Sequence, residues 1–184
     1  MRLFLSAVLY TALALGANAQ GLDTGALAAL REGTLKKLVF AAAPHDVPQI
    51  PFVDADGAQH RLADWKGKYV LVNFWATWCA PCRKEMKSLE RLQQAFGGDD
   101  FEVVTIATTR NTLPAIRRFF SEISVTDLPI LIDDNARLSR EMGVLGLPTT
   151  LLLNRDGQEI ARLRGDAAWD SDSARAIVAR LVGS

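Results

Sequence analysis

Two patterns of apolar residues meet near the middle of the chain. Residues 69–75, Tyr-Val-Leu-Val-Asn-Phe-Trp, form a nearly continuous apolar run rich in β-branched and aromatic side chains, which is typical of a buried strand. Across residues 83–96 the apolar side chains instead recur at helical spacing. The pattern therefore predicts a strand that gives way to a helix within residues 76–82.

The chain beyond this junction alternates between short apolar runs and amphipathic segments. Predicted strands cover residues 101–107, 128–132, 149–153 and 159–163. Predicted helices cover residues 112–123, 135–142 and about 172–182. This alternation predicts an α/β fold with a mixed sheet and helices on both of its faces.

Upstream of the junction the predicted elements are shorter. Asp23 is placed to cap a helix that runs to about Leu38. The three prolines in residues 41–51 indicate an extended linker. Residues 52–53 and 61–62 flank an Asp-Gly step that suits a hairpin turn. The aspartates of that turn lack the ligand spacing of a calcium loop, so turn chemistry is favoured over a calcium site.

The first residues have the composition of an export signal. Arg2 precedes an apolar run from Leu3 to Leu15, and residues 17–19 supply the small side chains that a signal peptidase recognises. Cleavage before Gln20 is the favoured interpretation. The mature chain would then be periplasmic, in a compartment that oxidises thiols.

An uncleaved inner-membrane anchor through residues 3–19 is the alternative. Residues 3–22 carry no charge and are about long enough to span a bilayer, although several polar side chains among them weaken this interpretation. A buried core helix is a third and less favoured one. The anchored chain would also face the periplasm. The predicted organisation is a signal peptide or anchor in 1–19, a helix and linker in 20–46, and one folded domain in 47–184.

Charge and length narrow the classes of function. The 184 residues suit one domain with an N-terminal extension. Lys plus Arg and Asp plus Glu number 21 each, and the charges are interspersed rather than gathered into a basic stripe. We therefore expect no nucleic-acid partner.

The only two cysteines, Cys79 and Cys82, fall at the predicted junction of strand and helix. Cys79 would sit at a helix N-terminus, where free N–H groups and the helix dipole favour a thiolate and lower the thiol pKa. Cys82 follows one helical turn later, close enough to attack a mixed disulfide on Cys79. The spacing predicts a dithiol redox couple.

A Cys-x-x-Cys pair is also half of many metal sites. A structural zinc site normally needs four ligands. The sequence has no second cysteine pair, and His45 and His60 lie upstream at no recognised ligand spacing. Redox catalysis without metal or cofactor is favoured over a metal site and over an inert structural disulfide.

Two segments carry a resemblance to a known family. Residues 74–82, Phe-Trp-Ala-Thr-Trp-Cys-Ala-Pro-Cys, resemble the active-site segment of thioredoxin-like proteins. The continuation Arg-Lys-Glu-Met at 83–86 is similar to the TlpA/ResA branch of exported thiol:disulfide interchange proteins. Gly-Leu-Pro-Thr-Thr at 146–150 is similar to the loop in which this fold carries a cis-proline facing the cysteines.

The resemblance extends from about residue 47 to residue 181. It implies a thioredoxin fold, which is a three-layer α/β/α arrangement around a central mixed sheet. It also implies an N-terminal β-hairpin extension and a central βα insertion. The domain of residues 47–184 would then be thioredoxin-like.

By this resemblance the peptide bond between Leu147 and Pro148 is cis and lies beside Cys79. The backbone around it, including Thr149, would be free to pair with an extended substrate segment. The purely structural interpretation is a proline at the start of a strand, where no ladder donor is needed.

Two further residues of the motif are expected to contact substrate. Trp78 immediately precedes Cys79 and would shape the rim of the site, whereas Trp75 is expected to be a core aromatic. Pro81 is tolerated in the first helical turn and would stiffen the approach of the two sulfurs. The predicted substrate-binding set is Trp78, Pro81, Leu147, Pro148 and Thr149.

Glu85 is the third predicted catalytic residue, with Cys79 and Cys82. Asn73 occupies the position where thioredoxins carry a buried aspartate that helps to move a proton, and an amide cannot do so. Glu85 matches an active-site glutamate of the TlpA/ResA branch, three residues beyond Cys82 on the same helix face. It is interpreted either as a proton acceptor or as a solvated first-turn glutamate favoured by the helix dipole.

The resulting hypothesis is an exported thiol:disulfide oxidoreductase that mainly reduces exported proteins. By resemblance, a membrane thiol reductase would supply electrons, and clients would be cytochrome c precursors or copper-site proteins of respiratory oxidases. An oxidase or isomerase is the alternative, because the motif alone does not fix the redox potential. A Cu(I) metallochaperone using both thiolates is less favoured.

Overall fold

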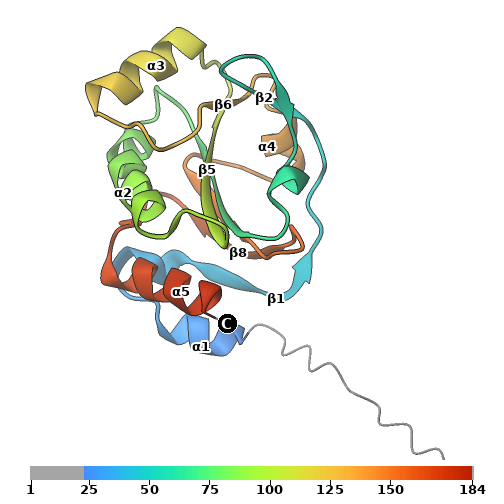
Figure 1. Ribbon diagram of the computed structural model, residues 1–184, viewed down its shortest axis with the longest axis vertical. Coiled ribbons are helices and arrows are strands. Elements are labelled where there is room, and N and C mark those ends of the chain that lie inside the picture. The colour runs from blue at the N-terminus through green and yellow to red at the C-terminus, as the bar shows by residue number, and fades with distance from the viewer. Residues whose placement is uncertain (1–22, 184) are drawn as a thin grey trace, which may run out of the picture.

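An eight-stranded sheet organises residues 23–183, the part of the chain that the computed structural model describes (Figure 1). Its strands lie in the order β1-β8-β7-β4-β5-β6-β2-β3. They are β1 (Val39–His45), β2 (Phe52–Asp54), β3 (Gln59–His60), β4 (Tyr69–Trp75), β5 (Phe101–Thr108), β6 (Leu131–Asp133), β7 (Thr149–Leu153) and β8 (Glu159–Arg164).

Strand β4 occupies the middle of this sheet. It pairs parallel with β5 and antiparallel with β7, and β6 continues the parallel part beyond β5. The remaining neighbours pair antiparallel. Every residue of β4 is buried, as its continuous apolar run predicts. The single polar residue of the strand, Asn73, lies opposite Thr150 of β7.

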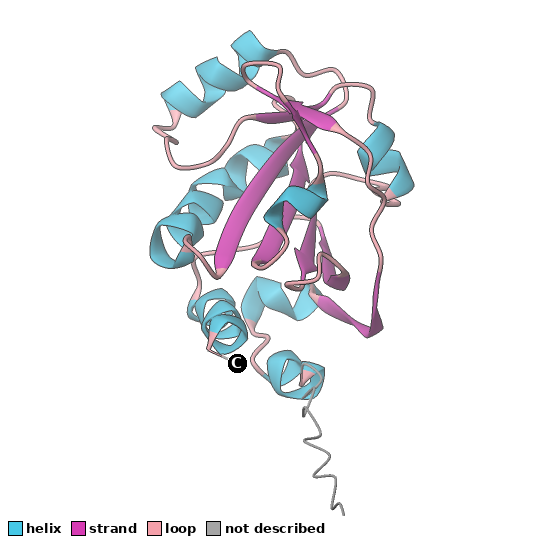
Figure 2. Ribbon diagram, turned by 45° about the vertical axis from the view of Figure 1, so that its right-hand side comes forward, coloured by secondary structure: helices cyan, strands magenta, loops and turns pink. Residues whose placement is uncertain are grey.

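Helices cover both faces of the sheet (Figure 2). They are α1 (Thr24–Ala29), α2 (Ala80–Phe96), α3 (Leu113–Glu122), α4 (Arg137–Glu141) and α5 (Asp172–Val182), with two short 3-10 helices, η1 (Gly33–Lys37) and η2 (Leu62–Trp65). The predicted α/β class, with a mixed sheet between two helical layers, is confirmed.

Alternate residues of β4 enter two separate apolar clusters. Leu71 and Trp75 pack with residues of α2, α3 and α5. Val72 and Phe74 pack on the other face with residues of α4 and η2. Because side chains alternate along a strand, Asn73 falls on the face that α2 covers.

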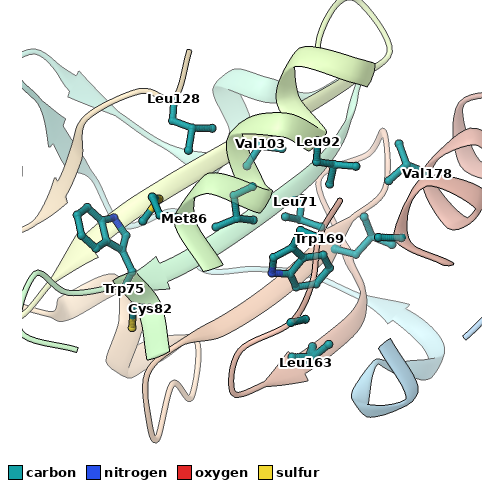
Figure 3. Packing of buried hydrophobic residues seen from close by; sticks show 14 of the residues in the cluster. Leu71, Trp75, Cys82, Met86, Leu92, Val103, Leu128, Leu163, Trp169 and Val178 are labelled. Atoms are coloured by element: carbon teal, nitrogen blue, oxygen red, sulfur yellow. The ribbon is translucent and has the colours of Figure 1, made fainter. Parts of the chain in front are cut away.

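The first of these clusters fixes the position of α2. Met86 and Leu92 of this helix are fully buried in it with Val103 of β5 (Figure 3). Cys82, in the first turn of the same helix, belongs to the same cluster and is fully buried. The start of α2 is thereby held against the end of β4.

The predicted helix from Asp23 to about Leu38 is wrong in its length. Asp23 does cap α1, accepting a hydrogen bond from the Ala26 N–H at 2.9 Å. The helix nevertheless ends at Ala29, and the short η1 follows. Gly33, the first residue of η1, has a φ of +49°, a left-handed conformation that a continuous right-handed helix does not contain.

The predicted linker is in part a strand. Residues 39–45 form β1, which pairs with β8 at one edge of the sheet, whereas residues 46–51 have no regular structure. Pro44 fits there because an edge strand leaves part of its backbone unpaired. Pairing with a distant strand, rather than local propensity, gives this segment its structure.

Two other strands are shifted from their predicted positions. The second arm of the N-terminal hairpin is Gln59–His60 rather than residues 61–62, because Arg61 already caps η2. Strand β6 begins at Leu131, beyond Pro129, which has no N–H to donate to a ladder. The hairpin itself, with its turn at residues 54–57, is confirmed.

The predicted signal peptide or anchor of residues 1–19 lies outside the described residues. Within residues 23–183, no helix is both long enough and apolar enough to cross a bilayer.

Candidate active site

The two cysteines lie where β4 ends and α2 begins, as the sequence predicts, and they form a disulfide. Cys79 is the N-cap residue of α2, and its sulfur accepts a hydrogen bond from the Cys82 N–H at 3.3 Å. Pro81 lies in the first turn, where its missing N–H leaves no helical bond unmade. Cys79 retains 6% of its surface exposed and Cys82 none. A partner can therefore approach only the first sulfur.

A hollow of about 520 Å³ adjoins Cys79. Trp78, Pro81 and Leu147 line it, so three of the five residues predicted to bind substrate meet there. Two large apolar side chains of its lining are unusually open to solvent, Trp78 at 54% and Leu145 at 87%. Thr108 and Ser139 also line it, and their hydroxyl groups hydrogen-bond each other at 2.8 Å. The hollow therefore has an apolar rim that suits an apolar side chain of a partner.

Trp78 is held from one side at the rim of this hollow. Its Nε1 donates to the Thr109 carbonyl at 3.3 Å, and the Arg110 guanidinium lies 5.6 Å from the ring centre. Trp75, by contrast, is buried and stacks on Phe120 at 5.5 Å. The expected difference between a core tryptophan and a rim tryptophan is confirmed.

The peptide bond between Leu147 and Pro148 is cis, as predicted. Pro148 and Thr149 are buried and are not part of the lining of the hollow. The Thr149 hydroxyl donates to the Gly146 carbonyl at 2.7 Å, and the Pro148 carbonyl accepts from the Gly165 N–H at 2.9 Å. Thr149 and the Pro148 carbonyl therefore hold the loop in shape, while Leu147 faces the hollow.

Glu85 is buried, with 2% of its surface exposed, so its interpretation as a solvated first-turn glutamate is wrong. One oxygen, Oε1, accepts from Asn73 Nδ2 at 2.8 Å. The other, Oε2, accepts from the Ala167 N–H at 2.9 Å and from Trp169 Nε1 at 3.0 Å. These partners come from β4 and from the loop between β8 and α5.

Burial raises the pKa of Glu85 from 4.5 to about 7, because desolvation penalises the carboxylate. The hydrogen bonds from Ala167, Asn73 and Trp169 oppose this rise, and the nearby charge of Asp166 adds to it. A carboxyl group with a pKa near neutrality can both accept and release a proton at physiological pH.

Three residues that hold Glu85 have no local sequence pattern that marks them as its partners. Ala167 and Trp169 lie more than 80 positions away in the chain and reach it only through the packing of the β8–α5 loop. Asn73 has no titratable group, and its role as a hydrogen-bond donor to Glu85 depends on how β4 and α2 pack.

The sequence model of the redoxin family matches residues 42–178. This chain belongs to the redoxin family. The matched segment holds every residue of the site described above, from Asn73 to Trp169.

Individual relatives of this chain carry names that agree with this family. A thiol-disulfide oxidoreductase ResA from Bacillus thuringiensis is 31% identical over 121 residues, covering 66% of this chain and 69% of the relative. The thioredoxin-like protein YneN from Bacillus subtilis is 36% identical over 124 residues, covering 66% of this chain and 71% of the relative. The resemblance to the TlpA/ResA branch is confirmed.

The thioredoxin fold is also confirmed by solved structures. A putative thiol:disulfide interchange protein DsbE from Chlorobium tepidum superposes with a TM-score of 0.67 at 23% identity, covering 76% of this chain and 97% of that one. Together with its Cys79–Cys82 disulfide, these findings make this redoxin a thiol:disulfide oxidoreductase.

The raised pKa of Glu85 predicts a particular dependence of stability on pH. The folded state holds the Glu85 proton up to about pH 7, whereas the unfolded chain releases it near 4.5. The contribution of neutral Glu85 is therefore fully present below pH 4.5 and is lost as pH rises through 7, by on the order of 3 kcal/mol.

Glu85→Gln cannot ionise and should lack this component. We expect the free energy of unfolding of the oxidised wild type to fall relative to the variant as pH rises from 4.5 to about 7, measured by urea titration. A constant difference between the two proteins across this range would contradict a raised pKa. Lys36→Gln, at an exposed lysine of η1, serves as the control.

Proposed function

We propose that this redoxin is exported and uses the Cys79/Cys82 dithiol to reduce disulfides of other periplasmic proteins. The observation that carries the proposal is the unequal access of the two sulfurs, one bordering an apolar-rimmed hollow and one fully buried. Export is supported by Arg2, by the apolar run that follows it and by the small residues 17–19.

In the proposed reaction the Cys79 thiolate attacks a client disulfide. One client sulfur leaves as a thiolate, and a mixed disulfide joins Cys79 to the other. The Cys82 thiolate then attacks the Cys79 sulfur, which releases the second client thiolate and forms the intramolecular disulfide. Two electrons pass from the dithiol to the client, and the two released client thiolates take up protons.

Glu85 is proposed as the acceptor of the Cys82 proton. Cys82 is fully buried among apolar side chains, and such a thiol gives up its proton reluctantly. Glu85 is one turn further along the same helix face and titrates near neutrality. It can therefore take the proton as Cys82 attacks and release it afterwards.

Client binding is proposed to use the hollow beside Cys79. Trp78, Leu145 and Leu147 offer apolar contact there, and an extended client segment would lie along the loop around Pro148. The electron donor would be a membrane thiol reductase. Cytochrome c precursors and copper-site proteins of respiratory oxidases are the proposed clients.

Trapping of mixed disulfides tests the roles of the two cysteines. Cys82→Ser retains the nucleophile and removes the resolving thiol, so it should accumulate covalent adducts with exported proteins. These adducts are resolved by non-reducing electrophoresis and identified by mass spectrometry. Cys79→Ser should accumulate none. The reverse behaviour of the two variants would overturn the assignment, and the trapped proteins identify the client class.

The direction of the reaction is tested by the redox state of the pair in cells. Alkylation of thiols after an acid quench should find Cys79 and Cys82 largely reduced, because a partner returns electrons to them. The pair should become oxidised in cells that lack membrane thiol reductases. A fully oxidised pair in both strains would instead indicate the disulfide oxidase.

A further inference from the structure

The buried amide of Asn73 lies beside Glu85 with its oxygen unused. Nδ2 donates to Glu85 Oε1 and to Thr150 Oγ1, both at 2.8 Å, so both of its protons are engaged. Oδ1 is buried and has no hydrogen-bond partner within residues 23–183. An unpaired buried carbonyl is unfavourable, so this orientation of the amide requires an explanation from the groups around it.

The donors around Glu85 restrict where its proton can sit. Oε2 faces the Ala167 N–H and Trp169 Nε1, and neither of these groups can accept a hydrogen bond. The proton must therefore be on Oε1. The neighbour of Oε1 is Asn73 Nδ2, which is also a donor. The amide orientation in this structure fits ionised Glu85 and opposes the neutral acid.

A half-turn of the Asn73 side-chain amide removes this conflict. It exchanges Oδ1 and Nδ2 with almost no change of shape. Oδ1 would then accept from the protonated Oε1 of Glu85 and from the Thr150 hydroxyl, whose proton can rotate to suit. Nδ2 would take the place in which Oδ1 is now unpaired. The turned state leaves the two N–H donors of Nδ2 unpaired in place of one carbonyl oxygen, so the amide turns only where the new bond from neutral Glu85 outweighs that difference.

We propose that Asn73 is a positioning residue whose amide turns when Glu85 gains or loses its proton, so that the carboxyl group keeps three hydrogen-bond partners in both states. This inference rests on the proposed function, because the transfer of the Cys82 proton to Glu85 is the step in which Glu85 would gain and lose its proton. An aspartate at position 73 would repel the carboxylate, and an apolar residue would pair with neither form.

Few charged groups face Glu85 in the described part of the chain. The negative charge of Asp166, in the β8–α5 loop, raises the pKa of Glu85. Asp166 itself forms ion pairs with Lys84 at 3.3 Å and with Lys37 at 3.9 Å. On α2 the reduced Cys82 thiol would be a second titratable group. β4 and β7 contribute the uncharged Asn73 and Thr150. Of the hydrogen-bond partners of the Glu85 carboxyl group, only Asn73 can exchange donor for acceptor.

Nuclear magnetic resonance of the oxidised wild-type protein tests the turn directly. The Glu85 side-chain carbon shift reports its protonation, and nuclear Overhauser contacts between the Asn73 amide protons and Thr150 report the orientation. We expect these contacts above the Glu85 midpoint and their loss below it, with the same midpoint. Contacts that stay unchanged while Glu85 titrates would overturn the proposal.

Variants of residue 73 provide a second measurement. Asn73→Leu keeps the size but removes donor and acceptor. It should raise the Glu85 pKa by about 1 unit, because the ionised form loses a charge-assisted bond and the neutral form a weaker one. Thr150→Val is the matched control. It deletes one bond to Asn73 in both states and none to Glu85, so the pKa should stay within about 0.3 units.

Should Asn73→Leu fail to fold, Asn73→Asp keeps the shape and places two carboxyl groups in contact. The pair should then titrate in two coupled steps, the upper one above the wild-type Glu85 midpoint. A Glu85 midpoint that is unchanged in either folded variant would overturn the role of Asn73. None of these measurements involves disulfide exchange, so their failure is distinguishable from failure of the proposed function.

Discussion

Three hydrogen bonds to one buried carboxylate join the parts of the molecule that surround the cysteines. Glu85 lies in the second turn of α2, Asn73 in the central strand, and Ala167 and Trp169 in the loop that precedes α5. Charge-assisted bonds of this kind are stronger than neutral ones, yet burial makes the charge itself costly. The outcome is a carboxyl group with a pKa of about 7, fixed one turn beyond Cys82.

The apolar packing of α2 fixes where Glu85 lies relative to the two cysteines. Its face from Cys82 to Leu92 is buried against the strands, so the helix start and the end of β4 cannot move apart. Cys79 at the N-cap then borders the hollow while Cys82 is fully covered. One packing arrangement separates an accessible sulfur from a protected one and places the buried acid near the protected one.

Local sequence patterns were sufficient to predict the central strand, the helix that follows it and the redox centre between them. The run of residues 69–75, the helical spacing after Arg83 and the Cys-x-x-Cys pair placed strand, helix and redox centre correctly. The sequence did not predict β1, which exists through pairing with β8, or the break at Gly33. It also did not predict the hydrogen bonds to Glu85 from Ala167 and Trp169, because these join segments more than 80 residues apart whose proximity depends on tertiary packing.

The proton transfer from Cys82 to Glu85 is tested most directly by the rate of the resolving step. A mixed disulfide on Cys79 is formed first, and release of the leaving thiol is followed by stopped flow from pH 5 to 9 in wild type and Glu85→Gln. The wild-type rate should rise with an apparent pKa near 7 as Glu85 ionises, and the variant should lack this rise and be about 100-fold slower near neutrality. Profiles of equal rate and shape would show that Glu85 does not accept the proton.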